Sequence, residues 1–144
     1  MDLVDTKIIQ LLKQNGRMTS SEMSKHTHLS IPAVAERVRK LEDRGVIERF
    51  TVKLNREEMG QTMLAFIFVI LERTEDISVF RDKIIQVPEV LECHHLAGEY
   101  DYLLKVAVEG TKGLEAFISN SLKAIKGVAK TNTIIALSTL KEEV

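Results

Sequence analysis

The sequence of 144 residues is poor in several residue types, and each shortage excludes a class of protein. A single cysteine rules out an intramolecular disulfide and fits a reducing compartment. There is no tryptophan, and there are only two prolines and seven glycines, so the composition is not that of a collagen-like or low-complexity chain. The longest apolar run, Met63 to Leu71, has nine residues, whereas a membrane-spanning helix needs about 20. We therefore expect a globular protein with no membrane segment.

The first residues also lack the pattern of a secretory signal. Such a signal begins with a basic region followed by an apolar one, whereas this sequence begins with Asp2 and Asp5. Together with the lone cysteine, this predicts a cytoplasmic protein.

Motifs of catalysis and cofactor binding are missing as well. The sequence contains no glycine-rich phosphate loop and no CxxC, HExxH or GxSxG pattern. The nearest approach to a reactive cluster is Cys93-His94-His95. Neighbouring residues of a strand point to opposite faces, so Cys93 and His94 cannot form a dyad, and Cys93 with His95 supplies too few ligands for a closed zinc site. We expect no enzymatic activity, no metal and no cofactor.

The net charge of −1 hides an asymmetry between the two halves of the chain. Residues 1–60 carry 11 Lys and Arg against 9 Asp and Glu, whereas residues 61–144 carry 9 against 12. The excess of basic residues is largest between Arg17 and Arg56, where 9 face 5. Such an asymmetry suggests a binding module for a polyanion in the first half.

Three short helices are predicted in the first half. Asp2 is a good N-cap for the first, and Thr19-Ser20-Ser21-Glu22 is a capping box for the second. Ser30 caps the third helix, in which Pro32 occupies the first turn.

The third helix is the most informative of these. Val34, Val38 and Leu41 form an apolar stripe at helical spacing. Two helices joined by a short turn, the second with a basic free face, are typical of a helix-turn-helix that enters the major groove of DNA. The alternative is a solvated face with internal ion pairs, because Glu36 and Lys40 are four residues apart. The residues expected opposite the stripe are Ala33, Glu36, Arg37, Lys40 and Arg44.

The segment after the third helix and the second half of the chain predict a different architecture. Gly45 ends the third helix, and residues 46–52 alternate as a linker strand. Strands are then expected at 62–71, 90–97, 102–108 and 128–137, with helices at 76–86 and, capped by Thr111, in the stretch ending at Gly127. This order, βαββαβ, is that of a ferredoxin-like domain.

The strand at 62–71 predicts a partner. A strand covered on one face alternates apolar and polar residues, but Met63 to Leu71 does not alternate. We infer that a second copy of the chain covers the other face. The alternative is that the N-terminal domain or the linker strand packs there.

A turn is predicted at Gly98-Glu99-Tyr100-Asp101-Tyr102. It is either an ordinary hairpin turn or a binding turn that offers backbone N–H groups to a carboxylate and Asp101 to an ammonium group. Residue types alone favour the hairpin turn.

Over nearly its whole length the sequence resembles the leucine-responsive regulatory protein and asparagine regulator (Lrp/AsnC) family. The resemblance is carried by residues 2–9, 30–42, 45–50 and 98–102. It implies an α+β protein: an N-terminal winged-type helix-turn-helix domain at 1–60, followed by a ferredoxin-like βαββαβ domain at 61–144. One departure is His28, which stands where many relatives have glycine, so that a left-handed backbone is expected there.

The resemblance also implies a function. We expect a sequence-specific transcription regulator that binds double-stranded DNA, responds to a small effector such as an amino acid, and forms homodimers that assemble further to a tetramer or octamer. The alternative is a nucleoid-architectural protein without an effector. The expected DNA-binding residues are Ser20, Ser30, Pro32, Ala33, Glu36, Arg37, Lys40 and Arg44, and the expected effector-binding residues are Leu96, Ala97, Gly98, Tyr100, Asp101, Thr131 and Thr133.

Overall fold

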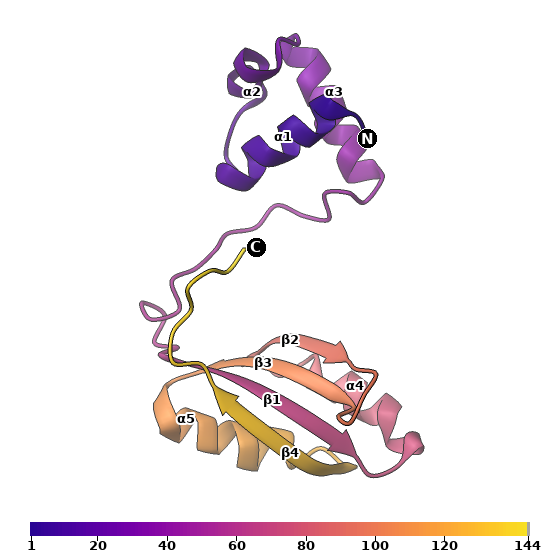
Figure 1. Ribbon diagram of the computed structural model, residues 1–144, viewed down its shortest axis with the longest axis vertical. Helices are drawn as coiled ribbons and strands as arrows, with labels where there is room; N and C mark the ends of the chain where they lie inside the picture. The colour runs from indigo at the N-terminus through magenta and orange to yellow at the C-terminus, as the bar shows by residue number, and fades with distance from the viewer. Residues whose placement is uncertain (144) are drawn as a thin grey trace. The chain divides into compact units, whose positions relative to one another are not determined.

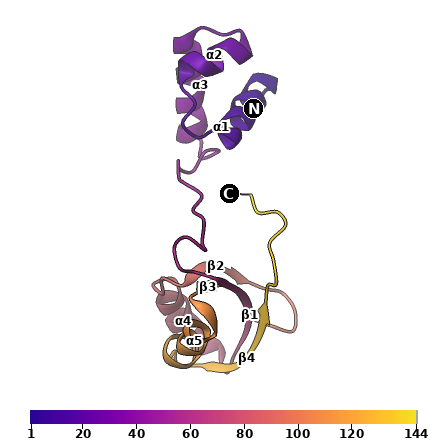
Figure 2. The same ribbon diagram turned by 90° about the vertical axis from the view of Figure 1, so that its left-hand side faces the viewer.

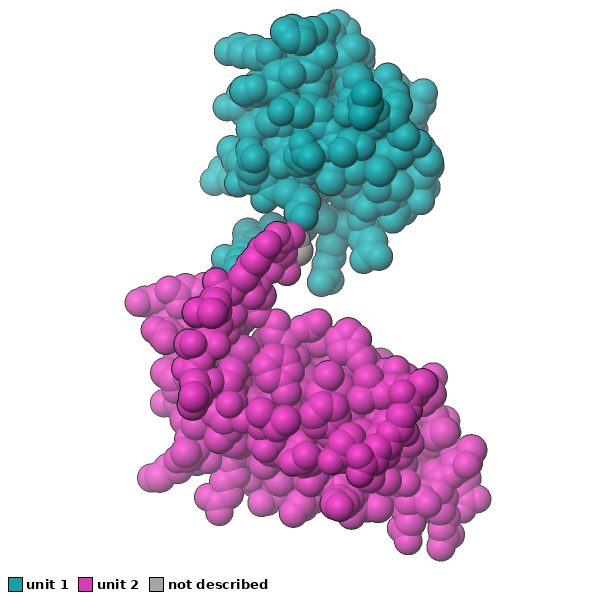
Figure 3. Space-filling view, viewed as in Figure 1, with its two compact units in different colours: residues 1–53 teal, residues 54–144 magenta. Residues whose placement is uncertain are grey.

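The computed structural model describes residues 1–143 (Figure 1). The chain divides into two compact units, one comprising Met1–Lys53 and the other beginning at Leu54 (Figure 3). Among the described residues, no helix combines the length and the apolar character needed to cross a membrane.

Unit 1 contains the three predicted helices, α1 (Leu3–Gln14), α2 (Ser20–Thr27) and α3 (Ile31–Asp43). Each begins with a cap that the sequence predicted. In α1, the Asp5 amide donates to Asp2 Oδ1 at 2.9 Å, and the Asp2 amide donates to Asp5 Oδ2 at 3.1 Å. Thr19 and Glu22 form the same reciprocal pair in α2, and Ser30 caps α3.

A small core and one unusual turn hold the three helices together. His28 adopts the expected left-handed conformation, with φ of 59°, at the C-cap of α2. This conformation reverses the chain between α2 and α3, and a residue with a β-carbon adopts it at some cost in energy. The buried side chains of the core are Ile8, Leu11, Met23, Val34 and Leu41.

The predicted linker strand at 46–52 is wrong for this chain. The amides of Val46 and Ile47 both donate to the Leu41 carbonyl oxygen, at 2.9 and 3.1 Å, so they close the end of α3. Residues 48–55 then have no regular secondary structure. A strand requires a neighbouring strand for its backbone groups, and no strand among the described residues lies in register with this segment.

Unit 2 has the predicted βαββαβ order. Its sheet is antiparallel with the strand order β2-β3-β1-β4, and both helices lie on one face of it (Figure 2). The elements are β1 (Met63–Leu71), a 3₁₀ turn (Thr74–Asp76), α4 (Ile77–Ile84), β2 (Val90–His95), β3 (Tyr102–Val108), α5 (Gly110–Ala116), a π-helical segment η2 (Phe117–Leu122) and β4 (Val128–Ile135).

The expected cap of α5 is wrong. The helix begins at Gly110 rather than after Thr111, its N-cap is Glu109, and that residue makes no side-chain capping bond. Gly110 has φ of +60°, so the chain enters the helix through a glycine conformation and needs no hydroxyl cap. The chain then widens into η2, which the helical period of the apolar residues did not predict.

The two faces of the sheet differ in burial. On β1, Ala65, Ile67 and Val69 are fully buried against the helices. The alternate residues of β1 are only half-buried in the single chain. We call the second face the open face, and on β1 it consists of Leu64, Phe66, Phe68 and Ile70.

Candidate functional site

The solvent side of α3 carries the predicted basic residues. Lys40 and Arg44 are exposed, and Ala33 is half-exposed on the same side. These three residues line a hollow of about 330 Å³ together with Asp5, Glu36, Arg37 and Leu41.

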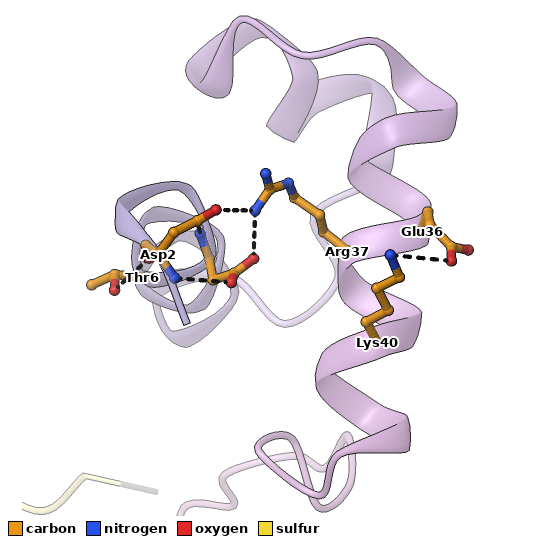
Figure 4. Close-up of polar contacts among 6 residues, drawn as sticks. Asp2, Thr6, Glu36, Arg37 and Lys40 are labelled. Carbon is orange, nitrogen blue, oxygen red and sulfur yellow. Dashed lines mark hydrogen bonds and ion pairs between the residues drawn. The ribbon is translucent and has the colours of Figure 1, made fainter.

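Arg37 lines the same hollow as Lys40 and Arg44, but its guanidinium is already paired with two carboxylates. Its side chain turns toward the N-terminus of α1, where Nη1 lies 2.8 Å from Asp2 Oδ2 and 2.9 Å from Asp5 Oδ1 (Figure 4). The Asp2 and Asp5 pKa values are lowered, first by the amide hydrogen bonds of the capping box and then by the Arg37 guanidinium. All three groups therefore stay charged across the physiological range.

Further ion pairs lie along the exposed surface of α3. Arg39 donates to Glu36 at 2.7 Å and 3.0 Å and to Asp43 at 2.6 Å, while Lys40 Nζ lies 3.9 Å from Glu36. The hydrogen bonds from Arg39 lower the pKa of Glu36. Exposed pairs of this kind contribute little to stability, so Lys40 can leave Glu36 for a stronger anion.

The remaining expected DNA-binding residues lie at helix starts. Ser30 and Pro32 are exposed at the beginning of α3, and Ser20 is the first residue of α2. The positive end of a helix and its free amides favour anions.

The turn between β2 and β3 is tied to β1. The Asp101 amide donates to the Val69 carbonyl oxygen at 2.9 Å, and Asp101 Oδ2 accepts a hydrogen bond from the Leu71 amide at 2.7 Å. The Leu96 amide donates to the Asp101 carbonyl oxygen at 2.8 Å, and Ala97 and Gly98 are exposed at the tip. The carboxylate of Asp101 thus has a structural partner that the sequence did not predict.

Tyr100 lies over the open face of the sheet. Its ring packs on Phe68, and its hydroxyl oxygen accepts a hydrogen bond from Asn132 Nδ2 at 3.1 Å. Thr131 and Thr133 pair with Val69 and Ile67, so they share the helix-covered face, whereas Asn132 lies on the open face. Sequence reasoning missed Asn132, although the alternation of strand residues could have placed it there.

Cys93 and His95 share the helix-covered face, as expected for alternate residues. The ring of His95 stacks on Tyr102, and burial raises the pKa of the Cys93 thiol, which disfavours the reactive thiolate. Within residues 1–143, no group of three or more His, Cys, Asp or Glu side chains is placed to hold a metal ion.

Two protein-family models match this chain. A model described as winged helix-turn-helix DNA-binding matches residues 1–48, and one described as the Lrp/AsnC ligand-binding domain matches residues 64–144.

Similar proteins cover almost the whole chain. The HTH-type transcriptional regulator FL11 of Pyrococcus horikoshii is 35% identical over 99% of this chain and 93% of its own. The leucine-responsive regulatory protein of Escherichia coli is 31% identical over 99% of this chain and 88% of its own. A transcriptional regulator of Neisseria meningitidis, solved as a complex with L-Met, superposes with a TM-score of 0.95 at 30% identity over 99% of this chain and 94% of that one.

Proposed function

Because this chain belongs to the Lrp/AsnC family, and is a transcription regulator with a DNA-binding and a ligand-binding domain rather than an enzyme, we propose that it binds specific sites in double-stranded DNA under the control of an amino acid. It does so as a homodimer, which assembles further to a tetramer or octamer in the cytoplasm.

The DNA-binding part of this proposal rests on the free face of α3. Lys40 and Arg44 stand exposed beside Ala33, whose small side chain allows close approach to a base. Basic side chains neutralise phosphates, and side chains near the start of a recognition helix reach base edges. Ser20 and Ser30 at helix starts serve as phosphate donors, Pro32 and Ala33 contact the groove, and Glu36 can accept from a cytosine amino group.

The effector part rests on the turn at 98–101. Gly98 has φ of +157°, and a β-carbon added there would meet nothing within 4 Å, so its backbone is open to a ligand carboxylate. The second oxygen of Asp101 is suited to an ammonium group. Leu96, Ala97 and Tyr100 flank this position, and Thr131 and Thr133 of a neighbouring chain are the further polar partners in this proposal. The relative solved with L-Met supports an amino acid as the ligand class.

The homodimer part rests on the open face. Phe66, Phe68 and their neighbours present an apolar surface that the single chain leaves half-exposed. Phe50, Val52 and Leu54 alternate along the linker after α3 and are between 51% and 73% exposed. A second copy would cover the sheet and give the linker a strand partner, which removes both exposed apolar surfaces from water.

Calorimetric titration of the full chain with each proteinogenic amino acid tests the effector assignment. We expect one amino acid or a small related group to release or absorb heat, and Asp101→Asn to abolish that binding. Asn keeps an oxygen for the Leu71 amide, so the turn should stay folded. Affinity for DNA without ligand should be nearly unchanged in this variant.

The nucleoid-architectural alternative makes the opposite prediction. If no amino acid gives heat and none alters the footprint on DNA, the protein binds DNA without an effector.

A further inference from the structure

Two carboxylates at the start of α1 bind the same side-chain nitrogen of Arg37, which belongs to α3. Nη1 of Arg37 carries two N–H groups, and Asp2 and Asp5 each bind at that nitrogen. Three N–H groups remain, one on Nε and two on Nη2, and they make no hydrogen bond with the described residues. The edge formed by Nε and Nη2 presents two parallel N–H groups, which is a geometry that arginine uses for bidentate contacts.

Arg37 is partly exposed beside the basic residues of α3. The side chain of Arg37 is 31% exposed, and it lines the hollow that Lys40 and Arg44 also line. The side chain of Asp5, which also lines this hollow, is only 14% exposed, whereas that of Asp2 is 55% exposed. The guanidinium is therefore held at Nη1 by two carboxylates while the side chain keeps partial contact with solvent.

We propose that Asp2 and Asp5 are positioning residues for sequence readout, which hold Arg37 by Nη1 so that its Nε and Nη2 donors meet a guanine in the major groove. This inference rests on the proposed function, since it assumes that α3 enters the groove. A free arginine loses rotamer freedom when it binds, whereas an arginine already held in place loses less.

The charge of the cluster favours a base over a phosphate as the partner. Two carboxylates and one guanidinium carry a net charge of −1, so the carboxylates of Asp2 and Asp5 would repel a phosphate oxygen at Arg37. The O6 and N7 acceptors of guanine carry no formal charge and match a bidentate arginine edge. Lys40 and Arg44 remain the residues suited to phosphates.

The test measures how tightly the full chain binds two DNA probes. One is a duplex that the wild type enriches from a randomised library, and the other is an unselected pool of equal length. The ratio of the two dissociation constants measures specificity. Asp2→Asn keeps an N-cap side chain, Asp5→Asn keeps an oxygen that can accept from the Asp2 amide, and each variant removes one charge. We expect each to reduce the ratio about fivefold to tenfold, a part of what a bidentate base contact contributes.

Glu22→Gln is the matched control, because it removes one carboxylate from the capping box of α2 in the same unit. It should change the ratio by less than about twofold, the range of an ordinary surface substitution. Arg37→Lys retains a cation for the two aspartates but lacks the planar edge, so it should lose specificity as Arg37→Ala does.

The double variant Asp5→Asn/Arg37→Ala separates positioning from a structural role. If Asp5 acts through Arg37, adding Asp5→Asn to Arg37→Ala changes nothing further. Two results would overturn the inference and leave the proposed function standing. One is that Asp5→Asn lowers the specificity ratio equally with and without Arg37, and the other is that Asp5→Asn alone leaves the ratio unchanged. If the wild type enriches no sequence, specific DNA binding itself is refuted.

Discussion

The ring of Tyr100 packs on the ring of Phe68, with their centroids 4.7 Å apart and their planes tilted by 34°. Tyr100 belongs to the proposed effector turn, and Phe68 belongs to the open face that we propose a second copy covers. The hydroxyl of Tyr100 also accepts a hydrogen bond from Asn132 on that face. A ligand that moves this turn would therefore also change the surface available to the partner.

Tyr100→Ala should destabilise unit 2 by about 1–2 kcal/mol, because it removes an aromatic contact and a hydrogen bond. Tyr100→Phe keeps the ring and loses only the bond to Asn132, so it should cost about 0.5–1 kcal/mol. Urea unfolding of both variants measures the difference. Equal losses would mean that the ring contact contributes nothing to stability.

Lysine at two neighbouring positions of β1 should have different effects. Ile67 is buried beneath the helices, so Ile67→Lys places an unpaired charge in the core and should cost several kcal/mol, enough to unfold unit 2. Phe66 lies on the open face, so Phe66→Lys should fold and fail to dimerise. Circular dichroism and light scattering distinguish the two. A wild-type mass of one chain at micromolar concentration contradicts the proposed dimer.

Gly127 is packed against the buried side chain of Asp76. A β-carbon at Gly127 would lie 2.3 Å from Cβ of Asp76, and the backbone φ is +94°. Gly127→Ala should therefore destabilise the protein by about 1–3 kcal/mol through overpacking and backbone strain. Gly16→Ala is the control, since its β-carbon would meet nothing nearer than 3.9 Å. Thermal unfolding of the two variants should separate them clearly; similar melting temperatures would contradict the packing argument.

The C-terminal segment should detach as pH falls. Glu142 lies between Lys105, whose Nζ contacts it closely, and Arg56, whose Nη1 lies 2.9 Å away. Hydrogen bonds from both lower the pKa of Glu142 from 4.5 to about 2. The stability from this carboxylate is therefore complete above pH 4.5 and is lost as pH falls toward 2.

Urea unfolding at successive pH values between about 5.5 and 3 checks this dependence. The stability advantage of the wild type over Glu142→Gln should shrink with falling pH, by at most about 1.4 kcal/mol per pH unit for one proton. Glu115→Gln, at an exposed position of α5, is the control, and it should show no comparable trend. A pH-independent difference between the wild type and Glu142→Gln would refute the assignment.

The local elements of the fold could be predicted because their signals are local. The caps at Asp2, Thr19 and Ser30 and the strand Tyr102–Val108 follow from side chains a few residues apart. The linker strand could not be judged in this way, because a strand depends on a partner elsewhere. The entry to α5 was missed because Gly110 supplies a backbone conformation where the sequence suggested a hydroxyl cap.

The contacts within the candidate sites were harder to predict. Arg37 and its partners are separated by 32 and 35 residues, and their meeting depends on how α1 packs on α3. Likewise, the Asp101 carboxylate accepts a hydrogen bond from the amide of Leu71, 30 residues away, a contact that no local pattern reveals. The helical period placed Lys40 and Arg44 correctly on the exposed side, since solvent exposure follows from that period alone.

The salt dependence of DNA binding tests the central claim, that the free face of α3 binds DNA. The slope of the logarithm of affinity against the logarithm of salt concentration counts the phosphates neutralised. We predict that Lys40→Ala and Arg44→Ala each weaken binding to all sequences and flatten that slope by about one unit per contact. Lys112→Ala, on an exposed position of unit 2, should leave it unchanged. An unaltered slope in both α3 variants would contradict the account.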